Sequence, residues 1–244
     1  VGAVQINGLV DALLARAADI KGPVYLWYSL RLEQLLLALF GIACINTVVP
    51  RLSRAIKSGD KALAQSLFSL SYEKVYTLMF LGMLAIFSLG PSVVSLLYGR
   101  GEFSAFGIFK TTACLWAYGI GLIPTATVIL FSAIFYAEED FKTPMKISVF
   151  MVVLNAFLSL CFIGVFRWGA VSTALATSVS AWVNSLWLQN LLKKKNWRTE
   201  PLGRSFLGFF LQASLAAVLV LFLDKWWYGF VWLDASFSLC SNAT

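Results

Sequence analysis

The sequence predicts an all-α integral membrane protein, a polytopic bundle of about seven transmembrane helices. Hydrophobic residues make up 59% of the 244 residues and charged residues only 13%, and the mean hydropathy is +0.79. In a soluble domain about a quarter of the residues are charged. The apolar residues also form runs of roughly 20, which as helices cross about 30 Å of hydrocarbon and satisfy their own backbone hydrogen bonds.

Seven apolar runs are expected as spans, and residues that start or stop helices mark their boundaries. In chain order the expected spans are 1–19, 27–49, 76–97, 107–137, 144–166, 169–192 and 206–223. The first stops before Gly22-Pro23, and Pro50 closes the second, because proline lacks the helical N–H donor. A basic loop over 51–59 follows. Asp60 can then cap a short amphipathic helix, 60–71, that is expected to lie at the membrane interface.

Proline and glycine shape the third, fourth and fifth spans. Gly90-Pro91 is expected to kink the last turns of the third. The fourth is too long for one straight span and contains Gly119, Gly121 and Pro124, which predicts a tilt or a break. Pro144 stands in the first turn of the fifth, where its missing N–H does no harm.

The last two spans differ in character. The sixth carries small residues at a four-residue spacing, which predicts close contact with another helix. These residues are Ala170, Thr173, Ala174, Thr177, Ser178 and Ala181. From the order of the spans, residues 1–192 are expected to form a six-helix bundle with the interfacial helix near 60–71. Residues 193–244 add a basic loop, one further transmembrane helix and a tail, 225–244, that is interfacial or a truncated eighth helix.

The charges of the loops predict the orientation. Twelve lysines and arginines fall in the loops after the second, fourth and sixth spans, against four in the loops after the first, third and fifth. Because positive residues are retained in the cytoplasm, residue 1 is expected on the cytoplasmic side of a multi-pass protein.

Composition also excludes several functions. The chain has no histidine, so histidine metal sites and Ser-His-Asp triads are excluded. The four cysteines form no CxxC pattern and are expected to be packing residues. The basic residues lie in loops rather than in a basic domain, which argues against nucleic acid as a partner. We find no motif that indicates an enzyme, a cofactor or a metal.

Most polar residues within the membrane lie in the first two helices, where ionisable groups are candidates for function. Asn7 and Asp11 share one face of the first helix, and Arg16 lies near its outer end. Arg31 and Gln34 lie one turn apart in the second helix. Two arginines at a similar outer depth are suited to grip a phosphate, which guanidinium binds through a fork of donors.

Structural alternatives remain open for these side chains. Arg16 can pair with Asp19 and extend outward, and Arg31 can pair with Glu33 or with another helix. Asn155, Asn184 and Gln189 are expected to make hydrogen bonds between helices. The acidic residues 138–140 are expected to form a solvated turn.

Seven short stretches stand out by their order and spacing: QIN at 5–7 with Asp11, YSLRL at 28–32, FGIA at 40–43, VPRLSR at 49–54, LYGRGEFS at 97–104, FYA at 135–137 and DFKTP at 140–144. Together they resemble the MurJ/MviN family of lipid II flippases, within the larger group of multidrug and polysaccharide exporters. The resemblance covers about residues 5–192.

The resemblance implies two six-helix lobes around a central cationic cavity. This chain looks like the second lobe plus its continuation, without the first lobe. Arg31 matches a family arginine that lines the cavity. The chain departs from the family at Leu30, where an acidic residue is common, at Leu36, where proline is common, and at Arg16, where a small residue is usual.

The resulting hypothesis is that the intact protein moves a lipid-linked pyrophosphate sugar precursor across the bacterial inner membrane by alternating access. Arg31 would anchor the head group, with Arg16, Gln34, Asn7 and Asp11 lining or tuning the cavity. Its partners would be that precursor, membrane lipids and the missing N-terminal lobe. The alternatives are an ion-coupled exporter of drugs or polysaccharide intermediates, with Asp11 as the coupling site, and a membrane scaffold that does not transport.

Overall fold

The computed structural model describes residues 2–100, 103–197 and 214, and helices are the only regular secondary structure in these residues. In chain order the elements are α1 (Gly2–Ala18), α2 (Gly22–Leu36), the π-helix η1 (Leu37–Ile42), α3 (Ala43–Lys57), α4 (Lys61–Tyr98), α5 (Ala105–Ala137), α6 (Lys142–Phe166) and α7 (Ala170–Lys194). Since α2, η1 and α3 follow one another without a break, they form one rod, and the described residues form six rods in all. The predicted all-α bundle is confirmed.

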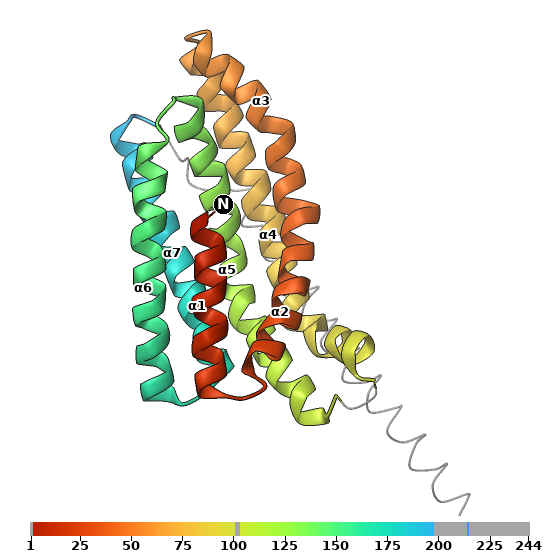
Figure 1. The fold of residues 1–244 in the computed structure, drawn as a ribbon. Helices are drawn as coiled ribbons and strands as arrows, with labels where there is room; N and C mark the ends of the chain where they lie inside the picture. The colour runs from red at the N-terminus through yellow and green to blue at the C-terminus, as the bar shows by residue number, and fades with distance from the viewer. Residues whose placement is uncertain (1, 101–102, 198–213, 215–244) are drawn as a thin grey trace, which may run out of the picture.

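Helix α5 is the centre of the bundle (Figure 1). It packs against α4 on one side and α7 on the other, and α6 and α1 lie beyond α7. Most of α5 is buried, including Leu122, Leu130 and Phe135. Helix α6, by contrast, exposes an apolar stripe along its length, as expected of a surface that contacts lipid tails. The stripe contains Met145, Val149, Phe150, Val153, Phe157 and Leu160.

Three helices, α4, α5 and α6, are long and apolar enough by themselves to cross a membrane. The rod formed by α2, η1 and α3 qualifies as a fourth when its two parts, which meet at 40°, are taken together. Helices α1 and α7 carry polar residues of both kinds: Asp11 and Thr173 are buried in the bundle, whereas Arg16 is exposed. The seventh expected span, 206–223, and the tail 225–244 lie outside the described residues.

Proline does not end the second span, contrary to the sequence prediction. The rod begins at Gly22 and continues through Pro50 to Lys57, so most of the expected basic loop 51–59 is helical. The helix instead changes at η1, where the π-helical turn accompanies the bend. Proline is tolerated in helices of membrane proteins because neighbouring groups satisfy the backbone that it frees.

The predicted separate helix at 60–71 is also wrong, because this segment is continuous with the third span in α4. Asp60 does cap it, accepting a hydrogen bond from the amide of Leu63 at 3.0 Å. The 38 residues of α4 measure about 57 Å at 1.5 Å per residue, far more than 30 Å of hydrocarbon. The helix therefore extends beyond the bilayer. It runs through Pro91, after which its last turns bend away from the axis of the others (Figure 1).

The fourth span has no break. Helix α5 continues through Gly119, Gly121 and Pro124, all of which are buried. The two glycines allow close packing instead: a Cβ at Gly121 would lie 2.6 Å from Ser178 Oγ, and one at Gly119 would lie 2.9 Å from a methyl group of Ile86. The same Ser178 hydroxyl donates to the carbonyl of Ala117 at 2.6 Å. Ser178, a small residue of α7, therefore meets Gly121 of α5, as predicted for close helix contact, whereas Gly119 gives room to Ile86 of α4.

Replacing Gly121 by valine should destabilise the bundle by about 1–3 kcal/mol, because the new side chain would push α7 away from α5. Thermal unfolding in detergent measures the effect. Gly164→Ala is the matched control, since no atom lies within 4 Å of a Cβ at that position and alanine favours a helix. Equal melting temperatures for Gly121→Val and wild type would contradict the close packing.

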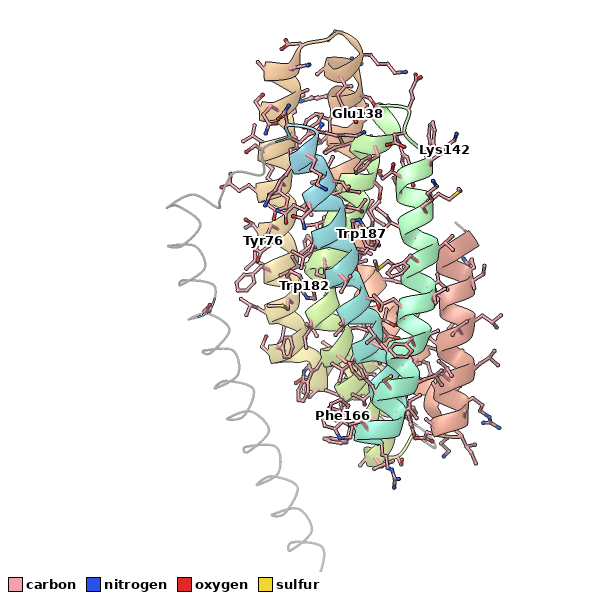
Figure 2. All side chains as sticks on the ribbon, turned by 90° about the vertical axis from the view of Figure 1, so that its left-hand side faces the viewer. Tyr76, Glu138, Lys142, Phe166, Trp182 and Trp187 are labelled. Atoms are coloured by element: carbon pink, nitrogen blue, oxygen red, sulfur yellow. The ribbon has the colours of Figure 1, made fainter. Side chains whose placement is uncertain are left out.

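The loops with many positive charges meet at one end of the bundle. The α3–α4 turn, the α5–α6 turn and the end of α7 all lie at the top of Figure 1. Figure 2 shows Glu138 and Lys142 at this end and Phe166 at the other. The alternation of charge along the sequence thus corresponds to two ends of one bundle. The positive-inside rule predicts that the basic end is cytoplasmic.

Candidate functional site

Helix α2 exposes the predicted pair Arg31 and Gln34. The guanidinium of Arg31 lies 4.5 Å from the centre of the Trp27 ring, and its Nη1 lies 3.5 Å from Oε1 of Gln34. Arg31 does not pair with Glu33, which is buried on the other side of the helix. Trp27 supports the guanidinium by a cation–π contact, while most of its hydrogen-bond donors stay available. Arg31 can therefore bind an anion without first breaking an ion pair.

Arg16 lies at the same end of the bundle, in the last turn of α1. It is exposed, and its guanidinium donates to the carbonyl of Ile20 just beyond the helix. Among the described residues it makes no ion pair, so the alternative pairing with Asp19 does not form. Asp19 instead accepts a hydrogen bond from the backbone amide of Lys21 at 3.0 Å.

Asp11 and Asn7 lie inside the bundle rather than on an open surface. Asp11 is only 6% exposed. Its Oδ1 accepts from Asn155 of α6 at 2.8 Å, and its Oδ2 accepts from Thr177 of α7 at 3.0 Å and from Asn7 at 3.2 Å. Asn155 also donates to Oδ1 of Asn7 at 2.8 Å. Asp11 is thus the acceptor that connects three helices.

The five predicted residues therefore occupy two separate places. Arg31, Gln34 and Arg16 are exposed, while Asn7 and Asp11 form the buried network with Asn155 and Thr177. The expected role of Asn155 between helices is confirmed. Thr177 belonged to the predicted small-residue stripe, but its hydrogen bond to Asp11 could not be read from the spacing.

Two arginines were not predicted as candidate site residues, because their segment was expected to be a loop. Arg51 and Arg54 are exposed on α3, and Arg54 Nε donates to the carbonyl of Pro50 at 3.2 Å. Asn46 is exposed one turn earlier. The three-residue spacing of Arg51 and Arg54, which places them on one face of a helix, was the available signal, but Pro50 was taken as the end of the helix.

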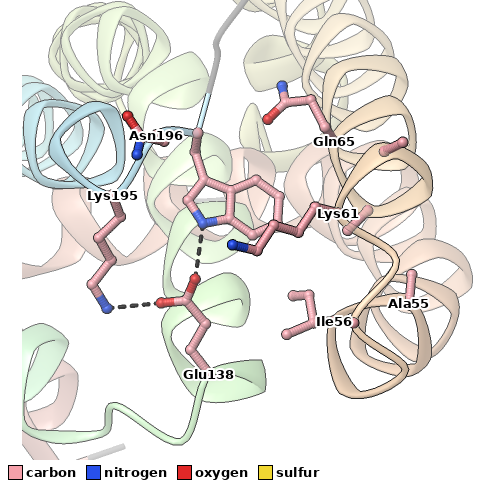
Figure 3. A pocket seen from close by; sticks show the side chains of 11 residues that line it. Ala55, Ile56, Lys61, Gln65, Glu138, Lys195 and Asn196 are labelled. Carbon is pink, nitrogen blue, oxygen red and sulfur yellow. Dashed lines mark hydrogen bonds and ion pairs between the residues drawn. The ribbon is translucent and has the colours of Figure 1, made fainter.

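The acidic turn at the basic end is a structural contact rather than a solvated turn. Glu138 accepts from Lys195 Nζ at 2.7 Å and from the indole N–H of Trp197 at 2.9 Å (Figure 3). Trp197 packs edge-on against Phe68 of α4, with ring centres 5.5 Å apart. We call Glu138, Lys195 and Trp197 the Glu138 clamp. It ties the segment after α7 to α5 and α4.

The pKa values of two side chains beside or within the clamp, Asp140 and Lys195, are shifted. Hydrogen bonds from Thr143, and after them the Lys195 ammonium, hold the pKa of Asp140 below its usual value. Partial burial alone would lower the pKa of Lys195, but its contacts with Glu138 and Asp140 outweigh burial and raise it. The contribution of Asp140 is lost as pH falls through its lowered pKa, and that of Lys195 as pH rises through its raised pKa. The ion pair between Lys195 and Asp140 therefore contributes most between these two pKa values.

Replacing Glu138 by glutamine should lower the stability by about 1 kcal/mol, because the amide presents a donor to Lys195. Thermal unfolding at pH 7 measures the loss. Glu139→Gln removes the same charge from an exposed neighbour and should leave the melting temperature unchanged. The difference between Glu138→Gln and wild type should shrink at alkaline pH as Lys195 loses its proton. A difference that is the same at every pH would contradict the ion pair.

Comparison with known proteins was made by family model and by individual relatives. The family model described as "Lipid II flippase MurJ" matches residues 1–242. A probable lipid II flippase MurJ of Chlamydia muridarum is 32% identical over 181 residues, which are 74% of this chain and 34% of that protein. The corresponding protein of Rhizobium meliloti is 31% identical over 228 residues, which are 92% of this chain and 42% of that protein.

A solved structure has the same fold. A structure described as lipid II flippase MurJ in an inward closed conformation superposes with a TM-score of 0.75 at 24% identity. The match covers 91% of this chain and 44% of that one. The chain therefore spans less than half the length of the proteins that it resembles.

Proposed function

The chain belongs to the lipid II flippase MurJ family of multi-pass membrane transporters, and on that premise we propose that it is the second lobe of a lipid II flippase. The complete protein carries lipid II, a lipid-linked pyrophosphate sugar, across the bacterial inner membrane by alternating access. The missing N-terminal lobe supplies the other wall of the cavity. Membrane lipids surround the bundle.

The observation that carries this proposal is the exposed guanidinium of Arg31, which forms no ion pair within the described residues. A pyrophosphate needs several charge-assisted donors, and a guanidinium supplies them in a planar fork. Trp27 supports the guanidinium without blocking those donors. Arg16 lies at the same end of the bundle, which adds positive charge near the outer mouth. Gln34 helps to orient Arg31 through the contact of its Oε1 at 3.5 Å.

The buried network gives the lobe a rigid body for alternating access. Asp11 connects α1, α6 and α7, so these helices move together when the lobes rock against each other. The bend at η1 lies in the same rod as Arg31. π-Helical turns within α-helices are frequently found at functional sites.

Depletion of the native flippase in bacterial cells tests the proposal. The full-length protein containing this chain should restore growth and the passage of labelled lipid II to the outer leaflet. A version that lacks the N-terminal lobe should not, because one lobe does not enclose a cavity. Normal growth with the full-length protein but no lipid II at the outer leaflet would contradict the proposed substrate.

An ion-coupled exporter is the second candidate, and the oxygen cluster at Asp11 favours it. The Asp11 carboxylate, the Asn155 amide and the Thr177 hydroxyl place several oxygens together inside the membrane, as a proton or alkali cation requires. Transport in proteoliposomes with and without a proton or sodium gradient separates the candidates. Efflux of drugs that requires the gradient, without movement of lipid II, would favour the exporter.

A further inference from the structure

A cavity of about 510 Å³ lies at the end of the bundle opposite the Glu138 clamp, where α2 and α5 begin and α4 ends. This is the outer end by the charge rule. We call it the outer aromatic pocket, and the lining residues that define it are Lys21, Tyr25, Tyr28, Tyr98, Arg100 and Phe103. The cavity is separate from the Asp11 network.

The aromatic wall of the pocket is held by contacts between its rings. Tyr28 stacks on Tyr98 with ring centres 4.3 Å apart, and Phe103 meets Tyr28 edge-on at 5.7 Å and Tyr25 at 6.5 Å. A Cβ at Gly107 would lie 3.4 Å from the Phe103 ring, so the absence of a side chain at Gly107 lets that ring pack against α5. A rigid aromatic wall suits the C–H face of a pyranose ring, which is flat and apolar on one side.

Two cations stand at the mouth of the pocket. Lys21 and Arg100 are exposed, and neither forms an ion pair within the described residues. Arg100 follows the aromatic wall directly, since its amide donates to the carbonyl of Tyr98 at 2.8 Å. Asp19, a carboxylate close to Lys21 in the chain, accepts a hydrogen bond from the backbone amide of Lys21 rather than from its ammonium group. Aromatic rings beside exposed cations fit a sugar that carries an anionic group.

The pocket adjoins the Arg31 site along α2. Tyr28, whose ring is part of the wall, lies one turn before Arg31 on the side of the outer end. A head group whose phosphates contact Arg31 therefore has its sugars within reach of the pocket as it moves outward. The spacing along the helix, about 4.5 Å for three residues, is shorter than one sugar ring.

We propose that the outer aromatic pocket is a second subsite, which binds a sugar phosphate portion of the substrate on its way to the outer face. The identity of the natural ligand rests on the proposed function, whereas the chemistry of the pocket rests on its own residues. The rings would contact the pyranose, and Lys21 and Arg100 would bind the anionic group.

Binding of N-acetylglucosamine 1-phosphate to the full-length protein in nanodiscs tests the inference. Saturation-transfer NMR titration should give saturable binding that Tyr98→Leu and Arg100→Gln each weaken about tenfold, the loss of one charged or stacking contact. Arg100 is exposed, so its replacement should leave the melting temperature unchanged even if Tyr98→Leu lowers it. The matched controls are Arg167→Asn at the same end and Tyr136→Leu on α5, both at exposed positions.

Three results would overturn the inference: no saturable binding to wild type, equal binding by the two variants and the two controls, or inorganic phosphate binding as tightly as the sugar phosphate. The test is independent of transport. If Arg31→Ala abolishes flipping while the pocket variants bind normally, the subsite is wrong and the function stands. If the pocket variants lose binding while Arg31 is dispensable for flipping, the subsite stands and the proposed role of Arg31 fails.

Discussion

Replacing Arg31 by alanine in the full-length protein is expected to reduce lipid II transport about a hundredfold or more. Each hydrogen bond between a guanidinium and a phosphate contributes about 1.5–3 kcal/mol, so the loss of two bonds accounts for that factor. The fold should be unaffected, because Arg31 is exposed and its contacts with Trp27 and Gln34 lie on the surface of α2. Complementation of flippase-depleted cells and lipid II accessibility at the outer leaflet measure the effect.

Two variants separate charge from geometry. Arg31→Lys keeps the positive charge but loses the planar fork, so it should restore only part of the activity. Arg167→Asn removes another exposed arginine, from the α6–α7 turn, where the backbone φ is 54°. Asparagine tolerates that left-handed conformation, and this control should transport normally. Wild-type transport by Arg31→Ala at normal expression would refute its assignment as the anchor.

Replacing Asp11 by alanine is expected to lower the stability of the lobe by about 2–4 kcal/mol, because donors on Asn7, Asn155 and Thr177 lose their shared acceptor in a dry interior. Single hydrogen bonds between membrane helices contribute about 0.6 kcal/mol on average. The larger expected effect depends on the three bonds that converge on one carboxylate. Thermal unfolding in nanodiscs measures it.

Companion variants identify the source of that loss. Asp11→Asn keeps the size of the side chain and one acceptor, so its effect should be smaller. Glu73→Gln removes a carboxylate from an exposed position on α4 and should be neutral. In Thr177→Val the further effect of Asp11→Asn should be reduced, since one of the bonds is already absent. Additive effects of the two substitutions would argue against a shared network.

The hydrophobic pattern predicted the six described rods in their correct order, but it also predicted a separate helix at 60–71 that is part of α4. Four helices begin and end within a few residues of the expected bounds: α1, α5, α6 and α7. In lipid, a single apolar segment satisfies its backbone hydrogen bonds by forming a helix along its whole length. Proline misled the prediction at Pro50. A rule learned from soluble helices gave Pro50 as a helix end, and the arginines at 51 and 54 were therefore assigned to a loop.

The roles of the candidate site residues were likewise predicted only in part from the sequence. Arg31 was identified from the sequence because a charged residue inside an apolar run has few explanations. The roles of Thr177 and Asn155 were not fully readable, since a hydroxyl or an amide in a helix takes its partner from whichever helix packs beside it. Asp11 was predicted to line the cavity because the sequence does not show which helix packs against it.

By itself the sequence determined the class of this protein, the order of its spans, the end that carries the positive charge and the presence of Arg31 in a membrane helix. Those properties depend on local composition and on the free energy of transfer into lipid, which neighbours in the sequence report. Only the tertiary structure decided that Asp11 faces inward, that Gly121 receives Ser178, that Glu138 holds Trp197, and that four rings and two cations surround one pocket. Each of these depends on which faces of two distant helices meet, and the rotation and bending of the rods set those faces.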